Sequence, residues 1–420
     1  MALPALQSRS FCLYEGSSIF SLNGQWITRI VVGWVGWELT GSATWVGLLS
    51  FFLFAPTIAT SPFFGVLMDR VRLRPAAMIS QGIVAAATLV MFLLYVSGVL
   101  TIWSLSAVAL VIGVAASGER SVRMTIVPRM VDIGILPNAV AIHATNFNTA
   151  RLIGPAVGGL LIERFGTGPA MLVNFLLLLP FMVAVFFLKV REKEGSSSGR
   201  QHFMAEFWGG ARHAALQPLI REALILTTVT SLTVRGVLEI LPAIADGVFH
   251  RGAEGLGNMV AAGGAGALAA ALLNAFRQHR KWGEGIPLRA QIAIMLGLLA
   301  VAGLGISDKW TLAMVFVAIC GFCGTMIGIN MQATIQLTVD DDFRGRVMSL
   351  WMVTGIGTSA LGALLLGTFA DLIGLTQTLV GGGLIGIVLV VGVRYIHWRA
   401  GRIAAAQDAA ALREEKAAPS

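Results

Sequence analysis

Long apolar stretches separated by short polar breaks run along almost the entire chain. Twelve of them reach membrane-spanning length, for which an α-helix needs about 20 residues. The pattern therefore predicts an all-α membrane protein with twelve transmembrane helices. Their expected bounds are Ser17–Leu39, Thr44–Leu67, Ala76–Val99, Ile102–Ser117, Ala139–Ile162, Pro169–Leu188, Leu224–Ala245, Leu256–Phe276, Leu288–Ile306, Trp310–Leu337, Val347–Phe369 and Thr376–Ile396.

Composition supports the membrane interpretation. Of the 420 residues, 56% are hydrophobic and 12% are charged, whereas soluble domains carry about 25% charged residues. A soluble protein of this composition would have too little polar surface to cover its core. Cys12, Cys320 and Cys323 have no accompanying histidine cluster, so we expect neither a disulfide framework nor a metal site.

Basic residues are distributed unevenly about the expected helices. Most of the 30 Lys and Arg residues fall at the N-terminus, in the loops after the even-numbered helices and in the tail, whereas Arg164, Arg251 and Lys309 fall on the opposite side. The positive-inside rule then places both termini in the cytoplasm of a multi-pass protein in a bacterial inner membrane. The net charge of +8 is thus a topology signal, and no nucleic-acid partner is expected.

One long polar segment divides the chain. Lys189–Arg221 is charged and contains the flexible string Gly195–Gly199. We expect a six-helix half at 1–188, a cytoplasmic linker at 189–221, a second half at 222–397 and a cytoplasmic tail at 398–420. The halves also match in sequence at a constant offset of 208 residues, which predicts two pseudo-symmetric repeats. The matched positions are Gly154, Gly159, Glu163 and Gly166 with Gly362, Gly367, Asp371 and Gly374.

The fifth expected helix contains the string Gly154-Pro155-Ala156-Val157-Gly158-Gly159. Proline inside a helix frees a backbone carbonyl, and the glycines let a neighbouring helix approach closely. The string resembles the Gly-Pro-x-x-Gly-Gly core of the antiporter motif in helix 5 of the major facilitator superfamily. This resemblance implies that the glycines and Pro155 take part in gating, and the motif is typical of exporters.

A second motif follows the second expected helix. The string Gly65–Arg70 resembles the superfamily's loop motif Gly-x-Leu-x-Asp-Arg. In the family, the acid contacts the adjoining half near helix 11 and helps to hold the outward-facing state. The resemblance implies a gating role for Asp69 and Arg70. Arg72 and Leu73 depart from the family pattern, in which glycine and a basic residue are common.

Three longer strings resemble one branch of the superfamily. They are Trp34–Ser42, then Leu241–Asp246 with Gly252–Gly257, and finally Arg344–Leu350. They are similar to the drug:proton antiporter-3 or transmembrane secretion effector group, which includes enterobactin and macrolide exporters. The resemblance implies two six-helix halves that rock about a central site, with protons as the coupling ion.

Four charged residues are expected at membrane depth, where an unpaired charge costs about 3 kcal/mol on insertion scales. They are Arg29, Arg151, Arg235 and Glu239. Glu239 follows Arg235 by four residues, so a regular helix would bring the two within salt-bridge reach. A cavity lined by these side chains would favour an anionic or chelating substrate. Alternatively, the arginines bind backbone carbonyls and Arg235 forms a purely structural pair with Glu239.

Other polar residues remain open to two interpretations. Asn146 and Asn330 are expected within helices, where they would bind substrate or bridge helices. Glu119, with Arg120 and Arg123, ends the fourth expected helix. That cluster is either an interfacial anchor or a gating element beside Asp69.

These features together predict a secondary active transporter, not an enzyme. Gly381–Gly383 lacks the Lys-Ser/Thr of a phosphate loop, so no nucleotide cofactor is expected. We expect a monomer that exports a small amphiphilic or anionic compound, siderophore- or drug-like, in exchange for protons. The alternatives are a lipid or lysolipid flippase of the same fold, an uptake carrier, and a non-transporting membrane receptor or assembly factor.

Overall fold

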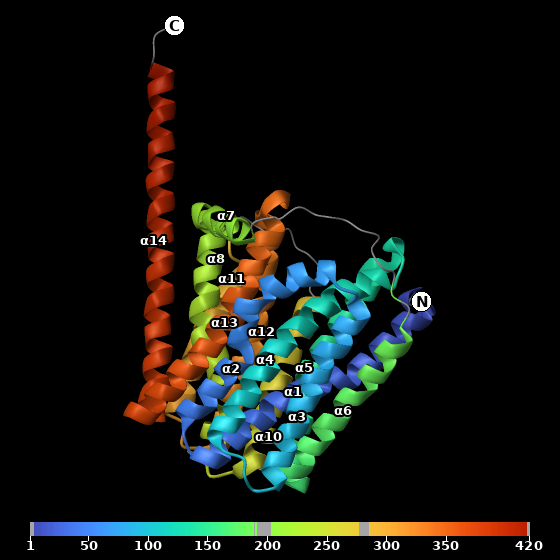
Figure 1. Cartoon of the computed structure of the whole chain (residues 1–420). Coiled ribbons are helices and arrows are strands. Elements are labelled where there is room, and N and C mark those ends of the chain that lie inside the picture. The colour runs from blue at the N-terminus through green and yellow to red at the C-terminus, as the bar shows by residue number, and fades with distance from the viewer. Residues whose placement is uncertain (1–3, 189, 191–202, 277–284, 418–420) are drawn as a thin grey trace.

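The structure is a computed structural model that describes residues 4–188, 190, 203–276 and 285–417. Helices dominate these residues, and none of them forms a strand. Figure 1 shows the helices as a bundle. They are α1 (Arg9–Thr40), α2 (Ala43–Arg70), α3 (Leu73–Val96), α4 (Ile102–Ile126), α5 (Leu136–Phe165), α6 (Thr167–Phe187), α7 (Phe203–Leu216), α8 (Pro218–Thr230), α9 (Leu241–Ala245), α10 (Gly252–Phe276), α11 (Leu288–Gly305), α12 (Trp310–Thr338), α13 (Asp341–Ile373) and α14 (Leu375–Ala417).

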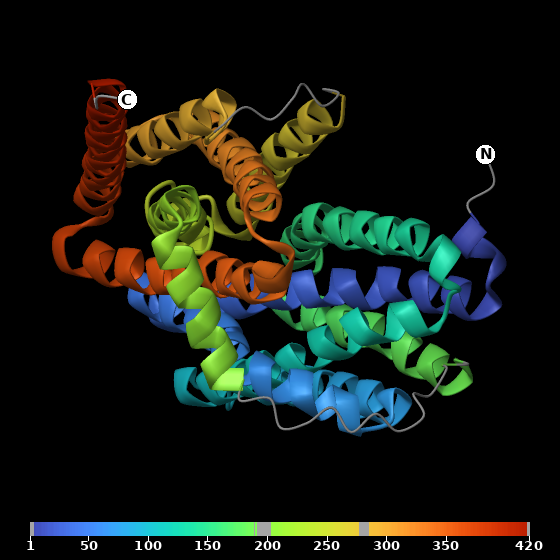
Figure 2. The ribbon, with the colours of Figure 1, turned by 90° about the horizontal axis from the view of Figure 1, so that it is seen from above.

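The buried apolar residues form separate cores in the two parts of the chain. Two clusters lie within α1–α6 and the residues flanking them. A third cluster draws its buried members from Ala214 to Val390. We call α1–α6 the N-terminal half and α8–α14 the C-terminal half; Figure 2 shows them beside each other from above.

Nine helices in the described part of the chain are long and apolar enough to cross a membrane, against the twelve expected. The three expected spans that fall short correspond to α1, to α5, and to α8 together with α9. Polar side chains such as Asn23 and Gln25 in α1 and Asn146 and Asn148 in α5 lower their mean hydropathy. Helix α8 has only 13 residues before the helical geometry changes.

The first helix of the C-terminal half is interrupted, which corrects the continuous helix expected over Leu224–Ala245. A π-helical segment, Ser231–Arg235, follows α8. The next amides bond three residues back instead of four, as in Glu239 N–H to Gly236 O at 3.1 Å. Helix α9 begins only at Leu241, with Pro242 in its first turn. The 3.6-residue period is therefore lost between Arg235 and Glu239.

Helices lie within the expected linker and cross the start of the expected tail. Part of the expected linker is helical, since α7 covers Phe203–Leu216. Helix α14 continues without a break through the expected boundary at 397 to Ala417. Its last part is rich in alanine, glutamate, lysine and arginine, which have high helix propensity.

The bundle has two distinct ends. The N-terminal segment and α7 lie toward the upper end in Figure 1, which we call the terminal end. The turns between α1 and α2 and between α13 and α14 lie at the lower end, which we call the closed end. At the closed end the two halves touch through α2 with α13 and through α5 with α10.

Glycines allow these cross-half contacts. A methyl group on Gly47 of α2 would lie 2.3 Å from the carbonyl oxygen of Ala363 in α13, and one on Gly367 would lie 2.2 Å from that of Ala43. Any side chain at either glycine would force the backbones of α2 and α13 apart. The closed end is thus held by helix backbones in direct contact.

Candidate functional site

An ion pair joins the two halves between α1 and the turn before α9. The Arg29 guanidinium bonds both carboxylate oxygens of Glu239, with Nε 2.7 Å from Oε2. The Glu239 side chain is 5% exposed and that of Arg29 is 24% exposed. The Arg29 guanidinium carbon lies 5.2 Å from the centre of the Trp26 ring and 4.9 Å from that of Phe54. Aromatic faces stabilise a cation at this range.

Arg235 does not pair with Glu239, so the expected i, i+4 pair is wrong. Its Nη2 donates instead to the carbonyl oxygen of Gly324 in α12, at 3.2 Å. The π-helical segment and the tight turn that follows it rotate Glu239 away from Arg235 and toward α1. Gly328 makes room for the guanidinium, because a methyl group there would lie 2.6 Å from Nη2.

Arg151, the third arginine of the site, is close enough to Arg29 and Arg235 for the charges to repel one another. The charge of Arg151, on α5, acts on both Arg29 and Arg235. Three guanidinium groups from α1, α5 and the π-helical segment therefore act on one another, and one of them, that of Arg29, bonds the Glu239 carboxylate. We call Arg29, Arg151, Arg235 and Glu239 the charged centre. Its excess positive charge is suited to a small anion.

The glycines of the helix 5 motif pack against two different partners. Methyl groups on Gly154 and Gly158 would meet α1, at 2.7 Å from Trp26 Cβ and 3.4 Å from Ile27 Cγ2. One on Gly159 would lie 2.4 Å from the Cα of Gly257 in α10, across the interface between the halves. Pro155 lies inside α5 and is buried. Through this motif, α5 packs both against α1, close to Arg29, and against α10 of the C-terminal half.

Glu119 is buried inside the N-terminal half. An anchor at the membrane interface would instead be in contact with water. It is 1% exposed and accepts hydrogen bonds from Arg123 Nε and Gln25 Nε2, each at 2.8 Å. Arg123 also donates to Ser18 and Ser21 of α1, at 2.9 and 2.7 Å. This network ties α4 to α1.

Asn146 and Asn330 both form hydrogen bonds between helices. Asn146 donates to the Glu15 carboxylate at 2.8 Å, and His143 bonds the same carboxylate at 2.8 Å. Asn330 is fully buried; it accepts from Arg289 at 2.7 Å and approaches Asn274 at 3.5 Å. Asn146 therefore joins α5 to α1, and Asn330 joins α10, α11 and α12. Both positions fit the helix-bridging interpretation.

The side chains of Asp69 and Arg70 lie outside the described residues, although their backbone ends α2. Their gating roles stay predictions.

The sequence identified no partner for three carboxylates that the structure places in cross-helix contacts. They are Glu15, Asp246 and Asp371. Asp246 and Asp371 each have a partner more than 200 residues away, in the other half. No local spacing could have identified those partners.

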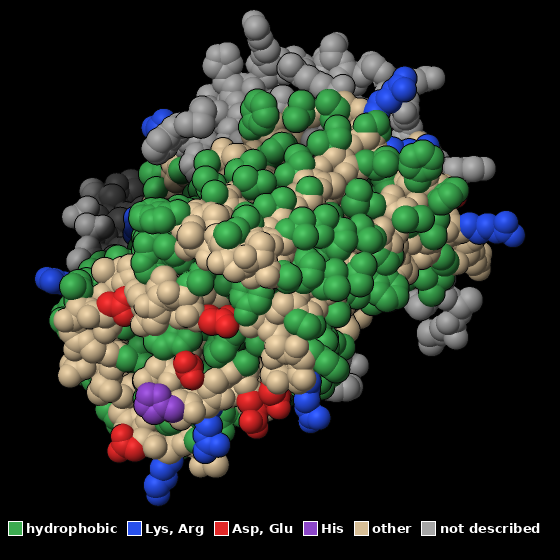
Figure 3. All heavy atoms as spheres, turned by 60° about the horizontal axis from the view of Figure 1, so that its bottom comes forward, with side chains coloured by type: hydrophobic (Ala, Val, Ile, Leu, Met, Phe, Trp, Pro, Cys, Tyr) green, Lys and Arg blue, Asp and Glu red, His purple; other side chains and the backbone are tan. Residues whose placement is uncertain are grey.

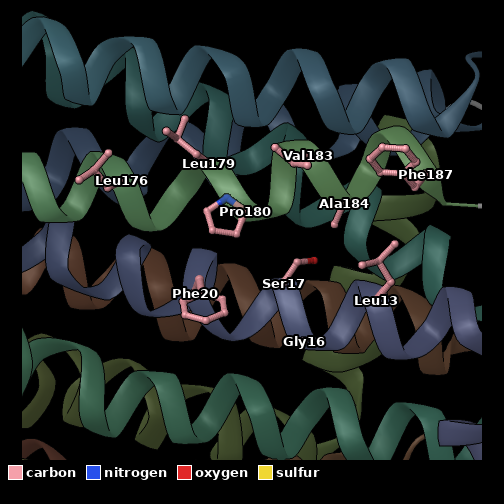
Figure 4. A pocket seen from close by; sticks show the side chains of 10 residues that line it. All are labelled: Leu13, Gly16, Ser17, Phe20, Leu176, Leu179, Pro180, Val183, Ala184 and Phe187. Carbon is pink, nitrogen blue, oxygen red and sulfur yellow. The ribbon is translucent and has the colours of Figure 1, made fainter.

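An apolar groove of about 650 Å³ lies away from the charged centre, between α1 and α6. Figure 4 shows Leu13 and Phe20 of α1 facing Pro180 and Phe187 of α6 across it. Ser17 supplies its one polar side chain. Hydrophobic side chains also cover most of the flank in Figure 3, whereas charged side chains gather toward the lower edge of that view. The groove is thus apolar, like a protein surface that faces lipid.

Solved structures with the same fold are membrane transporters. The nucleoside transporter NupG matches with a TM-score of 0.69 at 13% identity, covering 92% of this chain and 98% of its own. A bacterial homologue of the human lysosomal transporter Spinster, in an inward-facing and occupied conformation, matches with a TM-score of 0.68 at 14% identity, covering 93% and 97%. The protein therefore has the major facilitator fold.

Sequence comparison identifies the family within that class. The chain belongs to the transmembrane secretion effector family, whose model matches residues 2–417. It is 24% identical to the staphyloferrin A transporter of Staphylococcus aureus over 380 residues, 87% of this chain and 90% of that protein. It is also 24% identical to the MFS-type transporter YfiS of Bacillus subtilis over 405 residues, 92% and 94% of the two chains. These matches confirm the expected family.

Proposed function

We propose that the protein exports a small anionic or amphiphilic compound by alternating access, driven by protons that enter the cell. The charged centre is the observation that carries the proposal. One carboxylate neutralises one guanidinium, so the centre retains positive charge for a substrate. An Arg guanidinium binds carboxylates and phosphates through paired hydrogen bonds. A chelating, siderophore-like anion fits this chemistry, and the match to the staphyloferrin A transporter supports it.

Two features support export over uptake. The family is described as secretion effectors. The helix 5 motif typical of exporters packs α5 against both α1 and α10 through Gly158 and Gly159. With both termini in the cytoplasm of a bacterial inner membrane, the closed end shuts the periplasmic side. Asp69 and Arg70 then gate the opposite, cytoplasmic side.

Glu239 is the proposed coupling residue. Protonation of Glu239 or binding of an anion to Arg29 breaks the ion pair, and either event releases the tie between the halves. The carrier moves outward with the anion bound and returns with the proton bound, whereas the intact ion pair holds the empty carrier still. A proton and an anion thereby act on opposite partners of one ion pair, which couples their movements in opposite directions.

The test is flux in proteoliposomes that contain the purified monomer. We expect an imposed proton gradient to drive uphill movement of members of a panel of small carboxylate and phosphate anions that includes staphyloferrin A. The cationic dye ethidium should not move. Flux of ethidium alone would contradict the anion proposal, and flux of a lysolipid alone would favour a flippase.

A further inference from the structure

Asp371 lies at the closed end, in the last turn of α13, and bonds the first turn of α2 in the other half. Its carboxylate accepts from the Ser42 hydroxyl at 2.5 Å, from the Ala43 amide at 3.0 Å and from the Thr44 amide at 2.9 Å. Ser42 is the N-cap of α2, so the two amides belong to the first residues of that helix. Such amides have no partner within their own helix.

The position of Asp371 is unfavourable in its own helix and favourable for the neighbouring one. The C-terminal end of a helix carries a partial negative charge and the N-terminal end a partial positive charge. Asp371 lies two residues before α13 ends at Ile373, but points to the positive end of α2. Separation of the halves would remove three donors and leave the carboxylate beside the negative end of α13.

A second carboxylate, that of Asp246, bonds the N-terminal half at the same end. Asp246 accepts from the Trp37 indole Nε1 at 2.8 Å through one oxygen. Its other oxygen accepts from the amide of Gly252, the first residue of α10, at 3.1 Å. Both aspartates belong to the C-terminal half, and both hold the end of α1 or the start of α2.

Among the residues that the structure describes, the other repeat has no counterpart of the contact that Asp371 makes. Glu163 matches Asp371 at the offset of 208 residues, and it lies in the last turn of α5. Its nearest charged partner is Arg164, with Nε 3.8 Å from Oε1. The start of α10, which corresponds to the start of α2, is bonded by Asp246 of its own half. Pseudo-symmetry therefore supplies a natural control for Asp371.

We propose that Asp371 stabilises the closed end in addition to the Asp246 and glycine contacts, and that the transport cycle must release it from α2 before that end opens. This inference rests on the proposed alternating access. It assigns to Asp371 a positioning role distinct from that of the charged centre, because its contacts are with α2 and not with substrate.

The experiment measures the conformational equilibrium without substrate. Spin labels are attached at Phe165 of α5 and Ile306 at the end of α11, both 67% exposed, in a protein whose three native cysteines are replaced by alanine. A second pair at Met124 and Leu337, 66% and 64% exposed, reports the terminal end. Pulsed electron paramagnetic resonance then gives the distribution of distances between the two labels of each pair.

We expect Asp371→Asn to raise the ratio of long to short closed-end distances about tenfold, as expected for loss of charge-assisted bonds at a helix terminus. The terminal-end distances should shorten in the same protein. Asp371→Glu should keep much of the short-distance population, and Glu163→Gln should leave both distributions as in the wild type.

Ser42→Gly provides a milder variant. Glycine is a tolerated N-cap, but it lacks the hydroxyl that donates to Asp371, so we expect a smaller shift in the same direction. Unchanged distances in Asp371→Asn and Ser42→Gly, or an equal shift in Glu163→Gln, would overturn the assignment. Absent wild-type flux combined with the expected distance shift would count against the transport proposal and leave the role of Asp371 intact.

Discussion

Arg29 on α1 and Glu239 before α9 form an ion pair that ties the two halves of the protein together. The pair is partly shielded from water by Trp26 and Phe54, whose rings lie against the guanidinium. Two further arginines, Arg151 and Arg235, act on Arg29 through their charges. A change in the charge of Glu239 would therefore alter both the contact between the halves and the net charge of the centre.

Glu239→Gln should abolish uphill, proton-driven efflux and preserve downhill exchange. Glutamine cannot lose a proton and carries no charge to hold Arg29, so binding remains while coupling is lost. Flux in proteoliposomes with and without a proton gradient checks this, with Glu163→Gln as the matched control. Uphill efflux with wild-type pH dependence in Glu239→Gln would make Glu239 a structural partner of Arg29.

Arg235→Gln should weaken anion affinity about tenfold, since a charge-assisted hydrogen bond contributes about 1.5 kcal/mol or more. The maximal rate should fall less, because the Arg29–Glu239 pair remains. Arg251→Gln is the control, as Arg251 packs over Trp310 at 5.5 Å, away from the charged centre. Equal affinities in the two variants would remove Arg235 from the binding site.

Gly159→Ala should open the closed end. The added methyl group would lie 2.4 Å from the Cα of Gly257, so α5 and α10 would have to separate. We expect longer distances between labels at Phe165 and Ile306. Gly16→Ala, on α1, meets nothing within 4 Å and should leave them unchanged. A short-distance population equal to the wild type would show that the glycine contact does not determine closure.

Glu119→Gln should destabilise the N-terminal half by about 3 kcal/mol, because it leaves the Arg123 charge buried without its carboxylate. Glu163→Gln breaks only a partly exposed contact and should cost at most about 1 kcal/mol. Thermal unfolding in detergent compares them. Similar midpoints, combined with lost flux in Glu119→Gln, would instead support the gating role first considered for Glu119.

Topology gives a fifth prediction. A reporter fused after Ser198 should be cytoplasmic, and one inserted near Gly252 should be periplasmic, because basic residues concentrate on the first side. Reporter activity in intact cells measures both. Detection of both reporters on one side would refute the proposed orientation.

The sequence by itself determined the class and the family, and it predicts the division of the chain. Membrane-length apolar stretches and the low charge content require a helical bundle in lipid, because every backbone polar group must be satisfied internally. The polar segment Lys189–Arg221 and the repeat that relates Gly154 to Gly362 indicate two halves. The glycine-proline string and Asp69 identify the superfamily. These features are local or periodic, so no knowledge of packing is needed to recognise them.

Only the tertiary structure decided which charges meet. Spacing predicted that Glu239 pairs with Arg235, but the π-helical segment and the tight turn after it direct Glu239 to Arg29. The same limit applies to Asp371, whose bond to Ser42 spans more than 300 residues. Helical periodicity specifies neighbours three or four residues apart. Contacts across the halves depend instead on how closely the helices approach, and glycines such as Gly47 and Gly367 allow that approach only once the whole bundle is assembled.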